Sequence, residues 1–116
     1  MIDREKMVEL LIEEFPEIEE DITDETWAGL VHLEASSFAR HTQKTVDNRD
    51  EAQLKKCYAI ARRLVLEGDD SVKNAMHVSY LEHLNLRDGK IPRSWALELM
   101  PEPLITGYRQ LWGNDR

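Results

Sequence analysis

Apolar residues recur at three- and four-residue steps along almost the whole chain, and this period constrains the fold more than any other feature. Side chains spaced in this way share one face of an α-helix. No stretch alternates apolar and polar residues for long enough to indicate a β-strand. The sequence therefore predicts an all-α fold of five or six helices, arranged as antiparallel hairpins in a single domain over residues 1–116.

Prolines, glycines and capping residues mark the helix boundaries. The first predicted helix covers residues 3–15, because proline at position 16 disfavours helical backbone at the residue before it. The second is expected to run from about residue 23 to about residue 46. Asn48 is the predicted N-cap of the third helix, which ends at Gly68.

The second half of the chain predicts three further helices. Between Val72 and Leu84 apolar residues surround the helix axis, so we expect the fourth helix at the centre of the fold. Pro92 and Pro103 suit the first positions of the fifth and sixth helices. A turn is expected around Gly89.

The net charge of −8 is concentrated at the N-terminal end. Residues 1–26 hold eleven acidic and two basic side chains, a net charge of −9, whereas the other ninety residues carry +1. Such a one-signed field attracts basic partners and repels nucleic acid and anionic membranes. We therefore predict a basic protein partner, against the alternative that the charge serves only solubility. The candidate binding residues are Glu13, Glu17, Glu19, Glu20, Asp21, Asp24 and Glu25.

Three features indicate a cytoplasmic protein. The only cysteine, Cys57, cannot form an intramolecular disulfide, so an oxidising compartment is not needed. The first residues lack the basic segment and apolar run of a secretory signal. No stretch approaches the roughly 20 apolar residues of a membrane span. Cys57 lies on the apolar stripe of the third predicted helix, where we expect an inert core residue.

Glu34 is the candidate for acid–base chemistry. It lies between Val31 and Phe38 on the apolar stripe of the second predicted helix, with His41 seven residues further along the same face. A carboxylate in such a place can transfer protons, but seven residues span about 10 Å of helix, too far for direct contact. The other explanation is that Glu34 pairs with a side chain of another helix. If Glu34 does transfer protons, the protein is a small enzyme that uses Glu34 and His41, and this is the alternative to a binding protein.

No cofactor or metal site is predicted. The four histidines do not form the i, i+4 or Glu-x-x-His pairs of helical metal sites, and there is no Gly-rich phosphate loop. Six basic side chains on the second and third predicted helices could also indicate nucleic-acid binding. Nucleic-acid-binding domains are usually net basic, however, and this chain is net acidic. We therefore interpret these side chains as a solvated face that docks on the acidic first helix. These are Arg40, Lys44, Lys55, Lys56, Arg62 and Arg63.

The stretch EGDDSVKNAMHVSYLEHL, residues 67–84, resembles a segment of small uncharacterised bacterial helical proteins, in which an acidic turn precedes an Asn-Ala and a Ser-aromatic-Leu-Glu step. Some of these resemble immunity proteins of polymorphic toxin systems. The resemblance implies an all-helical bacterial binding protein, an armadillo- or HEAT-like fragment or an irregular bundle. Its sharpest form is an immunity-like inhibitor of a cationic toxin. A homo-oligomeric structural protein, such as a homodimer joined through an exposed apolar patch, is a third possibility.

Overall fold

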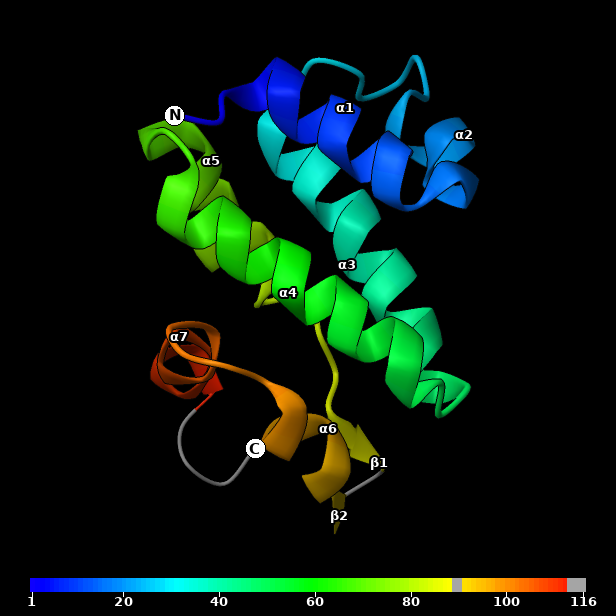
Figure 1. Cartoon of the computed structure of the whole chain (residues 1–116), viewed down its shortest axis with the longest axis vertical. Helices are drawn as coiled ribbons and strands as arrows, with labels where there is room; N and C mark the ends of the chain where they lie inside the picture. The colour runs from blue at the N-terminus through cyan, green and yellow to red at the C-terminus, as the bar shows by residue number, and fades with distance from the viewer. Residues whose placement is uncertain (89–90, 113–116) are drawn as a thin grey trace.

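Two long helices, α3 (Val31–Asp47) and α4 (Glu51–Glu67), run in opposite directions from a shared turn (Figure 1). The computed structural model describes residues 1–88 and 91–112. Within these residues seven α-helices make up most of the fold, so the predicted all-α class is confirmed. The remaining elements are α1 (Arg4–Glu14), the 3₁₀ turn η1 (Pro16–Ile18), α2 (Glu19–Ile22), α5 (Asp70–Ala75), the π-helical turn η2 (Met76–Tyr80), the strands β1 (Arg87–Asp88) and β2 (Ile91–Pro92), α6 (Ser94–Leu99) and α7 (Leu104–Trp112).

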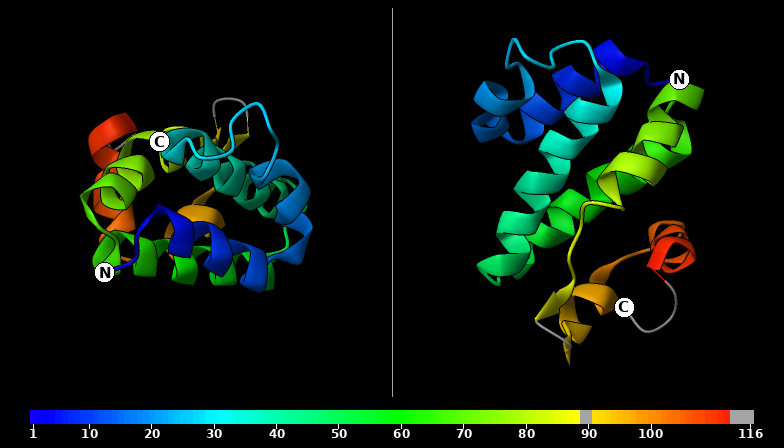
Figure 2. Two further views of the ribbon diagram at one scale, coloured as in Figure 1. Left: turned by 90° about the horizontal axis from the view of Figure 1, so that it is seen from above. Right: turned by 180° about the vertical axis from the view of Figure 1, so that it is seen from behind.

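The first helix begins and ends where the sequence predicts. The side chain of Asp3 accepts a hydrogen bond from the backbone N–H of Lys6 at 2.9 Å and caps α1, which ends before Pro16. Ahead of the helix, the backbone of Ile2 bridges to Gly68 at the end of α4. The first residues therefore lie beside the α4–α5 connection (Figure 2), and α1 packs against α3 and α5.

Helix α3, the second predicted helix, begins later than the sequence predicts. Residues 23–30 form turns, and α3 follows them. The carboxylate of Asp24 closes a local turn by accepting a backbone hydrogen bond two residues on. Gly29 has a φ of 91°, in the left-handed region that a right-handed helix cannot contain. Trp27 and Leu30, which match the helical period, therefore lie outside the helix, and Leu30 is exposed.

Both ends of α4 are fixed by short-range contacts. Asp50, rather than the predicted Asn48, is its N-cap and accepts a hydrogen bond from the backbone N–H of Gln53 at 3.2 Å. Asn48 instead ends α3. Gly68 ends α4 as predicted, and a Cβ atom there would lie 2.4 Å from the carbonyl oxygen of Leu64. This close approach requires glycine.

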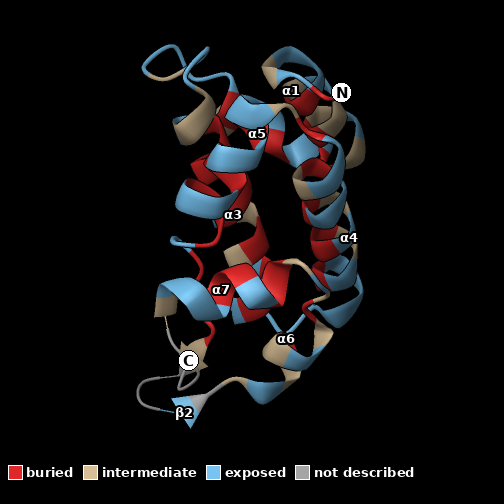
Figure 3. Ribbon diagram, turned by 90° about the vertical axis from the view of Figure 1, so that its left-hand side faces the viewer, coloured by how far each residue is buried: buried red, intermediate tan, exposed pale blue. Residues whose placement is uncertain are grey.

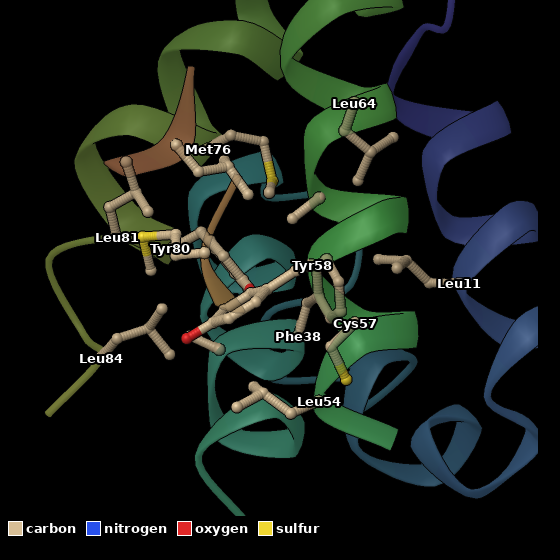
Figure 4. Close-up of a cluster of buried hydrophobic side chains, with 14 of the residues drawn as sticks. Leu11, Phe38, Leu54, Cys57, Tyr58, Leu64, Met76, Tyr80, Leu81 and Leu84 are labelled. Carbon is tan, nitrogen blue, oxygen red and sulfur yellow. The ribbon is translucent and has the colours of Figure 1, made fainter. Parts of the chain in front are cut away.

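The predicted fourth helix is divided into α5 and η2, which pack against both α3 and α4. Its buried side chains include Tyr80 and Leu81 (Figure 4). The hydroxyl of Tyr80 lies 2.9 Å from the Oγ1 of Thr42, and its ring lies 4.7 Å from that of Phe38. One side of this segment is nevertheless exposed, because its outer positions are mostly polar, which corrects the expectation of a helix enclosed on most sides. The exposed residues of α5 and η2 are Asp70, Ser71, Lys73, Asn74, His77 and Val78.

The C-terminal third lies along one side of the α3–α4 pair (Figures 1 and 2). Pro92 lies in the short hairpin instead of opening a helix, and α6 begins two residues later. The hydroxyl of Tyr58 in α4 donates to the carbonyl of Ala96 at 3.0 Å and ties α6 to the core. In α7, Gly107 permits a close approach to His77. Parts of the predicted turn and the chain end lie outside the described residues, namely Gly89, Lys90 and residues 113–116.

Burial follows the helical stripes (Figure 3). The inner faces of α3, α4 and α7 are buried and their outer faces are exposed. In α4 the predicted stripe is confirmed for most of its positions, and Val65 at its edge is half-buried. The fully enclosed members of the stripe are Leu54, Cys57, Tyr58, Ala61 and Leu64.

Candidate functional site

The seven acidic residues expected to bind a partner lie at the end of α1, in η1 and α2, and in the turn after α2. Figure 1 shows α1, α2 and this turn at one end of the molecule. Ile18 and Ile22, at most 3% exposed, hold this short segment on the core, so its acidic side chains face outward. Six of the seven residues are exposed and one is half-buried. We call this group the acidic surface: Glu13, Glu17, Glu19, Glu20, Asp21, Asp24 and Glu25.

Asp21 is the one member of the acidic surface that pairs with a lysine or arginine in the described residues. Its Oδ2 accepts from Nη2 of Arg40 at 2.8 Å and from Nε at 3.1 Å. Arg40 also lies over the ring of Trp27, 5.4 Å from its centroid. Glu17 lies 3.5 Å from Nε2 of His41. The members without any ion pair in the described residues are Glu13, Glu19, Glu20, Asp24 and Glu25.

The backbone N–H of Thr26 donates to the carboxylate of Asp24 at 2.8 Å and lowers the pKa of Asp24 below its usual value. A hydrogen bond of this kind favours the ionised carboxylate over the protonated acid. Asp24 therefore carries its negative charge at neutral pH.

Six lysines and arginines of the described residues interact with oxygens outside the acidic surface. Nζ of Lys56 donates to the carbonyl of Glu14 at 2.6 Å and lies 3.6 Å from its carboxylate, so the predicted contact of the basic face with the first helix is confirmed at this residue. Arg62 donates to the carbonyl of Glu102. The acidic surface consequently keeps most of its charge. The further ion pairs are Arg4–Glu34, Lys55–Glu51, Arg63–Glu67 and Arg93–Asp47.

A cleft of about 530 Å³ lies beside the acidic surface, between η1–α2, α3 and the start of α4. Glu17 and Asp21 line it from η1–α2, and Asp50 and Gln53 line it from α4. The last three turns of α3 supply most of the remaining lining, including His41. Because the lining comes from three separate segments, this cleft could not be predicted from local spacing.

His41 is the most enclosed titratable group in the cleft lining. Its side chain is 13% exposed and its ring lies 4.8 Å from the ring of Phe15. Nε2 is buried, makes no hydrogen bond and lies 3.5 Å from Oε1 of Glu17. Burial lowers the pKa of His41 below 6.5, Glu17 opposes this shift, and Lys44 and Lys56 add to it. The imidazole is therefore neutral at pH 7.

Glu34 is 2% exposed and is tied to α1. Its Oε2 accepts from Nη1 of Arg4 at 2.8 Å and from the backbone N–H of Gly29 at 3.0 Å, whereas Oε1 is buried without a hydrogen bond. The interpretation that Glu34 pairs with a side chain of another helix is thus confirmed. No hydrogen bond or ion pair of the described residues joins Glu34 to His41, so the structure offers no direct contact for the alternative acid–base pair.

Sequence reasoning missed a polar cluster that links α3 to the α5–η2 segment. Nδ1 of His32 lies 2.7 Å from Oγ of Ser79, and its Nε2 lies 3.5 Å from Nδ2 of Asn74. More than forty residues of sequence separate His32 from Ser79 and Asn74, so no local spacing pattern predicts the cluster. Among the described residues, no group of three or more His, Cys, Asp or Glu side chains is placed to hold a metal ion.

Cys57 is buried in the core, as its position on the apolar stripe predicts. Burial raises the pKa of the Cys57 thiol to about 11, so the thiol is uncharged at neutral pH. A thiol is a poor nucleophile in this state, because the thiolate is the reactive form.

Several apolar side chains remain exposed on different elements of the described structure. They include Leu30, Leu33, Leu66, Val78 and Leu111. The homodimer suggested by the sequence stays a prediction. No helix in the described part of the chain has both the length and the apolar character that a membrane span requires.

One family model matches most of the chain. It is described as a domain of unknown function (DUF7674), and the match covers residues 8–113. The chain belongs to this family. The match includes the whole acidic surface and every residue that lines the cleft. Searches of curated proteins and of solved structures found no match. The family description assigns no activity, so the immunity-like resemblance of residues 67–84 stays a prediction.

Proposed function

We propose that the protein binds a basic protein partner through the acidic surface and catalyses no reaction. The observation that carries this proposal is the exposure of carboxylates that have no ion pair with the described part of the chain. Five members of the acidic surface are in this state. Their charge is available to a partner instead of being cancelled within the fold.

The physical gain from such a surface is mainly in association rate. Complementary charge accelerates encounter, and salt screens this effect over a distance of about 10 Å at 0.1 M. The same field repels phosphate groups, which supports a protein partner over nucleic acid or an anionic membrane. We also propose that the protein acts in the cytoplasm, as its sequence indicates.

A narrower form is an immunity-like inhibitor of a cationic bacterial toxin. The acidic surface supports it, because a cationic toxin is a basic protein. The resemblance of residues 67–84 supports it as well. In this form, expression of the protein should protect cells from the toxin encoded beside its gene, and a variant that lacks the acidic surface should not.

Affinity capture with two matched variants tests the general proposal. The protein is immobilised and exposed to extract of its native organism in about 50 mM salt, and bound proteins are identified by mass spectrometry. Both variants replace four exposed acids that have no ion pair in the described residues, and so both change the net charge from −8 to −4. The surface variant carries Glu13→Gln, Glu19→Gln, Glu20→Gln and Glu25→Gln. The control variant carries Glu9→Gln, Asp70→Asn, Glu82→Gln and Glu98→Gln.

We expect a basic protein to be retained by the wild type and the control variant and lost from the surface variant. Retention should also fall in about 0.5 M salt, where screening is nearly complete. Equal losses from both variants would mean that only net charge matters, and retention by the surface variant would refute the proposal.

A further inference from the structure

We propose that the cleft between η1–α2, α3 and α4 receives an arginine or lysine side chain of the basic partner. This inference rests on the proposed function and names the place where the partner is anchored. The cleft adjoins the acidic surface, because Glu17 and Asp21 belong to both. Its volume of about 530 Å³ falls within the range of about 300–1,000 Å³ that is usual for sites that enclose a ligand. Arginine is among the residues that most often anchor protein interfaces in such pockets.

The cleft holds the carboxylate of Glu17 beside the imidazole of His41 without a hydrogen bond between them. Oε1 of Glu17 and Nε2 of His41 are 3.5 Å apart. A guanidinium or ammonium group in the cleft can donate hydrogen bonds to the carboxylate of Glu17, whose side chain is 60% exposed.

The opposite side of the cleft offers a further carboxylate. Asp50 uses its Oδ1 to cap α4, and no hydrogen bond of the described residues involves its Oδ2. Asp21 contributes little net charge, because Arg40 already neutralises it. The acidic groups left for a ligand are therefore Glu17 and Asp50, on two different sides of the cleft.

Lys44 is the one cation in the lining without an ion pair in the described residues. Against Glu17 and Asp50 it leaves the cleft with a net charge of −1 at neutral pH, which favours a cation. The same residue supplies a sharp test. Removal of its ammonium group should strengthen the binding of a cation and weaken the binding of an anion.

The probe is the peptide acetyl-Gly-Arg-Gly-amide, and its citrulline counterpart has nearly the same shape without the charge. Binding is followed by the amide signals of ¹⁵N-labelled protein at about pH 7 and about 20 mM salt. We expect saturable shifts at Glu17, His41 and Asp50 with the arginine peptide only. Glu17→Gln should weaken binding about two- to five-fold, Lys44→Gln should strengthen it, and Glu9→Gln on α1 should leave it unchanged.

Three results would overturn the inference. They are equal binding of the citrulline peptide, equal effects of Glu17→Gln and Glu9→Gln, and weaker binding in Lys44→Gln. The amide spectrum of each variant shows at the same time that it is folded.

A second variant separates this inference from the proposed function. Gln53→Trp covers the cleft without a change of charge, and its backbone N–H can still bond to Asp50. None of the four residues replaced in the surface variant lines the cleft. If the captured partner is lost from the surface variant but kept by Gln53→Trp, the proposed function stands and the cleft inference fails. If Gln53→Trp loses the partner as well, both stand.

Discussion

Replacement of Arg4 by methionine tests the buried ion pair that joins α1 to α3. Methionine keeps most of the length and apolar surface of the arginine side chain but removes the guanidinium group. The carboxylate of Glu34, which is 2% exposed in the wild type, then has the backbone N–H of Gly29 as its remaining protein donor. The change therefore leaves a buried charge without its counter-charge.

The size of the effect follows from the geometry. Loss of one partner of a buried ion pair costs about 3–5 kcal/mol. Arg4 is 34% exposed, so water reaches the carboxylate of Glu34 once the guanidinium is gone, and the Gly29 hydrogen bond remains. We expect Arg4→Met to lower the free energy of unfolding by about 2–3 kcal/mol. Glu34→Gln keeps the shape and an acceptor oxygen, and the half-exposed arginine is rehydrated, so we expect a cost of about 1 kcal/mol.

Urea unfolding at about pH 7, followed by far-UV circular dichroism, measures these free energies for a small two-state domain. The double variant Arg4→Met/Glu34→Gln has no buried charge, so we expect it to be more stable than Arg4→Met alone. A cost below about 1 kcal/mol for Arg4→Met would refute the reasoning. A double variant less stable than Arg4→Met would refute it too, because it would show that the unpaired charge is not the cause.

Burial lowers the pKa of His41 below 6.5, so below about that pH the unfolded chain binds a proton that the folded protein does not, and stability falls. The urea midpoint should thus drop less between about pH 7.5 and about pH 5.5 in His41→Gln than in the wild type, and parallel drops would contradict this. Gly68→Ala should lower the free energy of unfolding by about 1–3 kcal/mol, and by more than Gly107→Ala does. The added Cβ meets a backbone oxygen at position 68, whereas at position 107 it meets the imidazole of exposed His77. Thermal unfolding of both variants tests this order. The buried Cys57 thiol, with a pKa of about 11, should resist a thiol reagent in the native protein and react in urea.

The helices that the sequence predicts best are those whose period and caps agree. In α4 the apolar stripe and Gly68 indicate the helix and its end, because both depend on contacts within a few residues. The start of α3 shows the opposite case. Trp27 and Leu30 continue the helical period, but Gly29 adopts a left-handed conformation and donates its N–H to Glu34. That acceptor is held in turn by Arg4, thirty residues away, so no local pattern reveals where the helix begins.

The candidate site divides along the same line. The exposure of the acidic surface could be predicted, since a run of carboxylates between two buried isoleucines has few ways to avoid solvent. The net charge of the acidic surface depends on tertiary contacts. A nearby lysine or arginine that pairs with a carboxylate elsewhere no longer neutralises this surface. Arg4 lies within the acidic first quarter of the sequence, yet its charge is used on Glu34 of α3. Arg40 and Lys56 come from α3 and α4, yet they cancel only Asp21 and Glu14. The net charge that the acidic surface presents to solvent therefore depends on how α1 and α2 pack on the long helices. A change that loosens this packing should also alter the binding of a basic partner.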